Sequence, residues 1–170
     1  MKNLSWIKGL VFGVLFSFIS AFVFTLLASA AIGGITSFTP ATIFRILVFM
    51  LTYGKDAFFG EGWLYFSVII PFAITFAILG GYFHNRNKLS SKKLWLISLL
   101  SAFLVTWYSG TIGAIFGETI VRGGIDTINV EGTLVWGTIY AFVLLPLTTP
   151  FARLLIGIFY KFVKIKSLQL

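Results

Sequence analysis

Cysteine is absent from the 170-residue chain, and histidine occurs once, as His84. Disulfides, thiolate metal sites and cysteine nucleophiles are therefore excluded, and a single histidine cannot build a histidine-rich zinc site. Acidic residues are also few, with five Asp and Glu against 13 Lys and Arg. We expect no bound metal and no cofactor.

Charge of either sign is scarce: 11% of the residues are charged, 58% are hydrophobic, and the mean hydropathy is +0.99. A soluble domain carries about 25% charged residues, so this chain has too little charge to cover a solvated surface. The net charge of +8 would suggest nucleic acid in a soluble protein, but no long basic, water-exposed segment is available for phosphate contacts. The composition predicts an integral membrane protein that binds no nucleic acid.

Four apolar stretches are each long enough to cross the hydrocarbon core of a bilayer, which takes about 20 helical residues. They cover residues 9–32, 63–83, 94–116 and 134–159. They lack the alternation of apolar and polar residues that marks the strands of a transmembrane barrel. We therefore predict one domain over residues 1–170, an all-α integral membrane protein folded as a four-helix transmembrane bundle.

A fifth apolar stretch, residues 40–53, is too short to span the bilayer. Thr39 suits a helix N-cap, Pro40 the first helical position, and Gly54 the residue that ends a helix. This pattern predicts a short helix after the first span, which is either interfacial or re-entrant.

Basic residues concentrate on one side of a four-span topology, which would hold ten of the 13 Lys and Arg residues. The positive-inside rule places that side, and with it both termini, in the cytoplasm, so we predict a multi-pass protein of the inner membrane. A second interpretation concerns the start of the chain. Lys2, Lys8, an apolar run and Ala28-Ser29-Ala30 resemble a cleavable secretory signal, although apolar regions of signals are shorter, about 7 to 15 residues.

Small residues recur every four positions in the first and third stretches. In lipid, helices associate by close backbone approach and hydrogen bonding, so such rows predict helix-packing faces. They also predict partners in the membrane: lipid, further copies of this chain, or another membrane protein. The two rows are Gly9, Gly13, Ser17 and Ala21, and Ala102, Thr106, Gly110 and Ala114.

Prolines interrupt the second and fourth stretches. Each removes a backbone donor, and the carbonyl freed at membrane depth must find another partner. The pattern has two interpretations: a tolerated kink, or a broken helix next to a polar cavity or hinge. The candidate hinge or cavity residues are Pro71, Pro146, Thr148, Thr149 and Pro150.

Beyond Pro150, basic and apolar residues fall on different faces at helical spacing. The chain could turn there into the cytoplasmic interface as a basic amphipathic helix. Alternatively, Arg153 could extend toward the headgroups from the end of a straight helix.

A weak internal repeat, IGGI…TIFR and IGAI…TIVR, relates the two halves of the chain. The match is either a duplication or a chance similarity in a low-complexity apolar chain, and a duplication would assign Arg45 and Arg122 to equivalent outer positions. With Glu118 and Asp126 they form a candidate charged cluster on the outer side. The cluster is either a solvated rim or a site at which the two arginines bind a carboxylate or phosphate.

No catalytic motif is present: the chain has no G-x-S-x-G, H-E-x-x-H or P-loop pattern. We predict that it is not an enzyme; a lipid-modifying activity through Glu118, Arg122 and Asp126 lacks a visible base–nucleophile pair. The leading hypothesis is a protein that acts by helix association, as an accessory subunit or an envelope, stress or drug tolerance factor. The alternative is a small oligomeric permease, exporter or pore for apolar or cationic solutes.

Overall fold

The computed structural model describes residues 2–33, 39–52, 64–86 and 88–165. Within these ranges the chain is helical and contains no strand, as the sequence predicts. The α-helices are α1 (Lys2–Gly33), α2 (Pro40–Thr52), α3 (Ile70–His84), α4 (Ser91–Tyr108), α5 (Ala114–Arg122), α6 (Val130–Val143) and α7 (Leu145–Ile165). The shorter elements are the π-helical turns η2 (Leu64–Ile69) and η3 (Ser109–Gly113) and the 3-10 turn η4 (Ile125–Thr127).

Three helical segments are long and apolar enough to cross a membrane: Ser5–Leu27, Tyr65–His84 and Ser91–Ile120. The last of these joins α4, η3 and α5 into one continuous rod. α6 and α7 qualify as a candidate span only when taken together, and a bend of 69° separates them. The described residues therefore contain three candidate spans, or four if the bent pair crosses as one.

The bend falls within the predicted fourth span, residues 134–159, for which the sequence left a tolerated kink and a broken helix as interpretations. The chain breaks at Leu144, before the first proline, whereas one interpretation placed the turn after Pro150. Pro146 has no N–H and its ring crowds the preceding turn, so a helix cannot run through it undisturbed. At the second position of α7 that missing donor costs nothing. Pro150 lies inside α7.

α1 and α3 pack so closely that their backbones touch. A Cβ atom added to Gly13 would lie 2.6 Å from the carbonyl oxygen of Phe72, and one on Gly9 would overlap the carbonyl of Phe76. On the other side of the contact, a Cβ atom added to Gly80 of α3 would overlap the carbonyl of Ser5 on α1. Glycine is required at these positions because any side chain would separate the two helices, and dispersion contacts between them are the main attraction available in lipid.

α6 packs against η3 through a second backbone contact, between Gly137 and Gly110. A Cβ atom on Gly110 would lie 3.2 Å from the Cα atom of Gly137. The indole Nε1 of Trp107, at the end of α4, donates a hydrogen bond to the hydroxyl of Thr138 on α6 at 3.1 Å. The rod formed by α4, η3 and α5 is thereby tied to α6.

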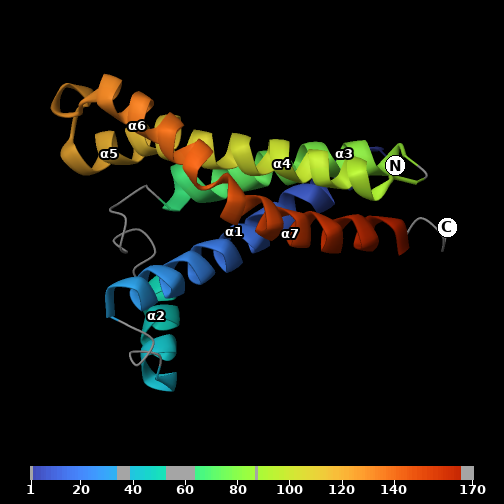
Figure 1. The fold of residues 1–170 in the computed structure, drawn as a ribbon, viewed down its shortest axis with the longest axis horizontal. Helices are drawn as coiled ribbons and strands as arrows, with labels where there is room; N and C mark the ends of the chain where they lie inside the picture. The colour runs from blue at the N-terminus through green and yellow to red at the C-terminus, as the bar shows by residue number, and fades with distance from the viewer. Residues whose placement is uncertain (1, 34–38, 53–63, 87, 166–170) are drawn as a thin grey trace.

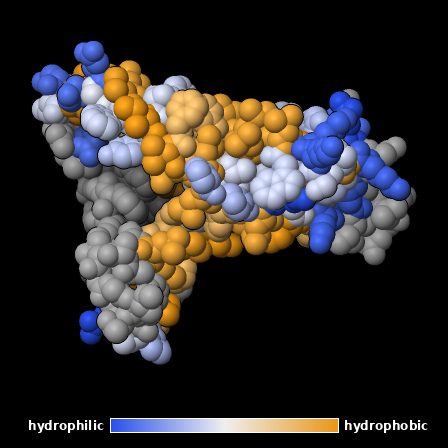
Figure 2. Space-filling model, viewed as in Figure 1, coloured by the Kyte–Doolittle hydropathy of each residue, from blue (hydrophilic) through white to orange (hydrophobic). Residues whose placement is uncertain are grey.

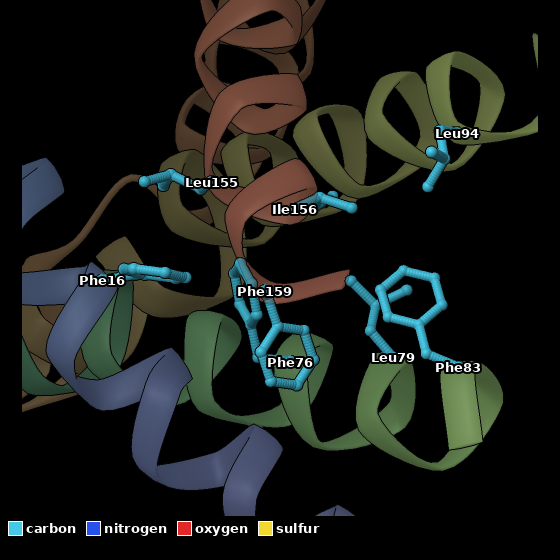
Figure 3. Packing of buried hydrophobic residues seen from close by; sticks show 8 residues of the cluster. All are labelled: Phe16, Phe76, Leu79, Phe83, Leu94, Leu155, Ile156 and Phe159. Carbon is cyan, nitrogen blue, oxygen red and sulfur yellow. The ribbon is translucent and has the colours of Figure 1, made fainter. Parts of the chain in front are cut away.

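A cluster of aromatic and aliphatic side chains joins α1, α3, α4 and α7 (Figure 3). Phe76 lies at its centre, with ring centroids 5.1 Å from Phe16 and 5.3 Å from Phe159 in edge-on arrangements. Phe83, Phe159 and Ile156 are almost completely buried. This cluster connects the α1–α3 pair to α7.

The beginning of α1, the end of α7 and the connection between α3 and α4 lie at the same end of the molecule (Figure 1). The hydroxyl of Tyr160 on α7 accepts a hydrogen bond from the backbone N–H of Leu89 at 3.1 Å, and Lys164 donates to the carbonyl of Arg86. Hydrophilic residues gather at the two ends of the visible surface, with an apolar band between them (Figure 2).

α2 forms where the sequence predicts a short helix. The hydroxyl of Thr39 accepts a hydrogen bond from the backbone N–H of Thr42 at 3.2 Å, so Thr39 acts as the N-cap. Gly54, the predicted end signal, lies outside the described residues. α2 extends away from the long helices at a steep angle (Figure 1).

Candidate binding cavity between the helices

A cavity of about 350 Å³ lies between the helices, where α1 and α3 face α4, α6 and α7. Its walls are mainly apolar, and none of the lining residues is charged. Hydroxyl groups are the polar component. They belong to Ser20, Thr75, Ser101, Thr106, Ser109, Tyr140 and Thr148.

Small residues of α4, η3 and α5 create much of this space. All four members of the row Ala102, Thr106, Gly110 and Ala114 line the cavity. Sequence analysis interpreted the row as a packing face; here it borders an open volume, and Gly110 also contacts α6. Short side chains that allow helices to approach in one place leave space where the opposite helix diverges.

The break between α6 and α7 forms one wall of the cavity. Leu144, at the break, and Thr148, one turn later, both line it. The Thr148 hydroxyl donates to the carbonyl oxygen of Leu144 at 3.0 Å, and the same oxygen accepts the backbone N–H groups of Leu147 and Thr148 in the first turn of α7. Of the five candidate hinge or cavity residues, only Thr148 lines the cavity.

Hydroxyls in the cavity wall are held by their own helices. Ser20 donates to the carbonyl of Phe16 at 2.6 Å, as Thr148 does to that of Leu144. A hydroxyl whose hydrogen is used in this way keeps its oxygen lone pairs as acceptors. These oxygens are therefore suited to accept a hydrogen bond from a molecule in the cavity.

The carbonyl freed by Pro71 finds its partner on another helix. Pro71 has no N–H to donate to the carbonyl of Ser67, four residues earlier. The Ser109 hydroxyl lies within hydrogen-bonding range of that oxygen and, at 2.7 Å, of the carbonyl of Val105. The two π-helical turns meet here, because a Cβ atom on Gly113 would lie 2.7 Å from the Cα atom of Ser67. Sequence analysis identified the freed carbonyls but missed Ser109.

Two buried hydroxyls have no hydrogen-bond partner in the described part of the chain. One is that of Ser67, which is fully buried beside Gly113. The other is that of Thr149, the neighbour of Thr148 on α7. Neither residue lines the cavity, and neither do Pro146 and Pro150.

The row Gly9, Gly13, Ser17 and Ala21 is buried along α1. Gly9 and Gly13 contact the backbone of α3, and Ala21 also lines the cavity. The residues of this row therefore make their contacts within this chain.

The candidate charged cluster is divided between separate parts of the molecule. Arg45 is exposed on α2, which extends away from α5 (Figure 1). Arg122 ends α5, with Glu118 half-buried one turn earlier on the same helix, and Asp126 follows on η4. Three of the four residues therefore belong to neighbouring elements, α5 and η4, whereas Arg45 belongs to α2.

Among the residues that the structure describes, no group of three His, Cys, Asp or Glu side chains is placed to hold a metal ion. The chemistry available in the cavity is that of apolar contact and hydroxyl hydrogen bonding. No protein-family model, curated protein or solved structure matches the chain.

Proposed function

We propose that the chain is a multi-pass protein of the inner membrane that binds a small, uncharged and mainly apolar solute in its cavity, as a small permease or exporter. The observation that carries this proposal is the cavity of about 350 Å³ beside the α6–α7 break. A dry apolar cavity of about 150 Å³ is enough to hold a benzene molecule. The volume here suits a solute of one or two rings.

The lining selects the class of solute. Apolar walls favour an apolar body, and the hydroxyl oxygens favour one that carries a hydrogen-bond donor. The lining residues include no carboxylate that could pair with a cation, and burying an unpaired charge is costly. We therefore propose neutral solutes in preference to the cationic ones that the sequence left open.

The arrangement of the helices is compatible with four crossings and cytoplasmic termini. The described ends of α1 and α7 and the α3–α4 connection share one end, which carries Lys8, Arg86, Lys92, Lys161 and Lys164. The positive-inside rule assigns such an end to the cytoplasm. The steep angle of α2 then favours an interfacial helix at the outer leaflet over a re-entrant one.

Helix association with a partner is less well supported than solute binding. The small-residue rows that motivated it are buried within this chain or line its cavity. Tolerance remains a compatible role, since an exporter of toxic apolar compounds protects the envelope.

Solute counterflow in proteoliposomes tests the proposal. The purified full chain is assayed with radiolabelled neutral aromatic compounds bearing a hydroxyl or N–H group, and with tetraphenylphosphonium as the cationic comparison. We expect saturable exchange of one or more neutral compounds. The variant Ala102→Trp fills the cavity and should abolish that exchange, whereas Leu104→Trp, on the same helix but 57% exposed, should retain it. Absence of saturable exchange for every compound, or full exchange by a folded Ala102→Trp variant, contradicts the proposal.

A further inference from the structure

Arg153 is a cation placed well inside α7. It lies eleven residues before Lys164, which is about 16 Å along a helix. Its side chain is half-buried, and its Nε atom is buried without a hydrogen-bond partner among the residues that the structure describes. The guanidinium carbon lies 5.8 Å from the centroid of the Trp95 ring on α4. The residue therefore sits in the seam between α4 and α7.

The absence of a side chain at Gly157 leaves space for the guanidinium of Arg153 to extend toward the end of α7. A Cβ atom added to Gly157 would lie 2.8 Å from the Nη1 atom of Arg153. The guanidinium therefore occupies the space that a side chain at position 157 would fill, one turn beyond its own Cα atom. This is the direction in which a basic residue extends to reach the headgroup layer.

No acidic side chain of the described residues is placed to neutralise Arg153. Glu118, Asp126 and Glu131 belong to α5, η4 and the start of α6, at the opposite end of the molecule (Figure 1). An isolated charge inside the apolar part of a membrane is costly, so a counter-ion there is strongly favoured. The anion that a bilayer supplies in the direction of the guanidinium, toward the end of α7, is the phosphate of the headgroup layer.

Further cations and an aromatic side chain flank the seam. Trp95 is 46% exposed, and Lys92 precedes it by almost one turn of α4. Lys161 follows Gly157 by one turn of α7. Both lysines are exposed and lie nearer the ends of their helices than Arg153 does. Basic pockets between helices on the cytoplasmic side are suited to anionic headgroups.

We propose that Arg153 binds the phosphate of an anionic phospholipid of the cytoplasmic leaflet, in the seam between α4 and α7. Trp95 supports the guanidinium from one side, Gly157 gives it room, and Lys92 and Lys161 attract the headgroup. The inference rests on the membrane orientation of the proposed function and is independent of solute transport.

Competitive lipid retention tests this site. The full chain is purified in a neutral detergent and supplied with equal amounts of phosphatidylglycerol and phosphatidylcholine, and the retained lipid is counted by native mass spectrometry. We expect a preference for phosphatidylglycerol of about tenfold, the factor that corresponds to a charge-assisted hydrogen bond. Arg153→Gln should remove that preference, and Arg153→Lys should keep part of it.

Two further variants separate the site from general charge and from misfolding. Gly157→Leu displaces the guanidinium without changing any charge, so it should also lose the preference. Lys88→Gln removes an exposed cation from the α3–α4 connection and should behave as wild type. Inorganic phosphate should not displace the retained lipid, because the bound group is a lipid headgroup.

Equal retention of the two lipids by the wild-type chain contradicts the proposal. So does an unchanged preference in a folded Arg153→Gln or Gly157→Leu variant, or displacement of the lipid by inorganic phosphate. Failure of solute counterflow would leave this site intact. Failure of the chain to insert into liposomes would instead overturn the membrane placement itself.

Discussion

The close contact between α1 and α3 predicts that a glycine-to-alanine substitution will destabilise the fold, which is the opposite of its usual effect in an exposed helix. In an exposed helix interior, Gly→Ala stabilises by about 1 kcal/mol, because alanine has the higher helix propensity. Gly13 is buried, and the added methyl carbon would lie 2.6 Å from the carbonyl oxygen of Phe72 and 2.7 Å from the Cα atom of Ala73. Both obstructing atoms belong to the backbone of α3, so rotation of a side chain cannot relieve the overlap.

The magnitude follows from the two opposing effects. Forcing an extra methyl group into a packed interface typically costs about 1–3 kcal/mol. After the gain in helix propensity of about 1 kcal/mol is subtracted, we expect Gly13→Ala to destabilise the fold by about 1–2 kcal/mol. Gly13→Ile, which adds three more carbons, should separate α1 from α3 and prevent folding.

Reversible unfolding by sodium dodecyl sulfate in mixed micelles, followed by circular dichroism, measures this difference. Leu10→Ala is the matched control, because Leu10 lies on the same helix with its side chain exposed and should change stability little. A Gly13→Ala variant as stable as wild type, or more stable, would show that the two backbones do not touch and would refute the packing described for α1 and α3.

Two other predictions concern the prolines. Ser109→Ala leaves the carbonyl of Ser67 without its partner from η3 and should destabilise by about 1–3 kcal/mol in the same unfolding assay. Ser98→Ala removes a bond to its own helix and should cost clearly less. Equal losses would count against the role of Ser109. Pro146→Ala restores a backbone donor at the α6–α7 break and should reduce the 69° bend. The distance between spin labels at Val135 and Leu154 should then increase, as measured by pulsed electron paramagnetic resonance. An unchanged distance would show that the proline does not maintain the bend.

Much of the helical organisation follows from local sequence properties. Run length and hydropathy identify the first three candidate spans, since the length needed to cross a bilayer depends on the helix alone. Thr39 and Pro40 predict the start of α2 for the same reason: an N-cap acts within a single turn. These features require no knowledge of how the helices are arranged.

The cavity and the break could not be predicted in the same way, because they depend on distant residues. Prolines at positions 146 and 150 show that backbone donors are missing, but the position of the break depends on which carbonyls find new partners. The carbonyl of Ser67, for which Pro71 provides no donor, finds its partner in the hydroxyl of Ser109, 42 residues further along the chain. Likewise, the row from Ala102 to Ala114 has the same spacing as the row on α1, and only the crossing of the helices makes it line a cavity.

The bend between α6 and α7 also resolves a mismatch of length. Residues 130–165 would form a straight rod of about 54 Å at 1.5 Å per residue, against a hydrocarbon core of about 30 Å. Unbent and upright, this rod would carry either its polar first turn or Lys161 and Lys164 far beyond the headgroups. Folding the rod by 69° shortens the distance between its two ends and so reduces the mismatch that this stretch would have in a bilayer.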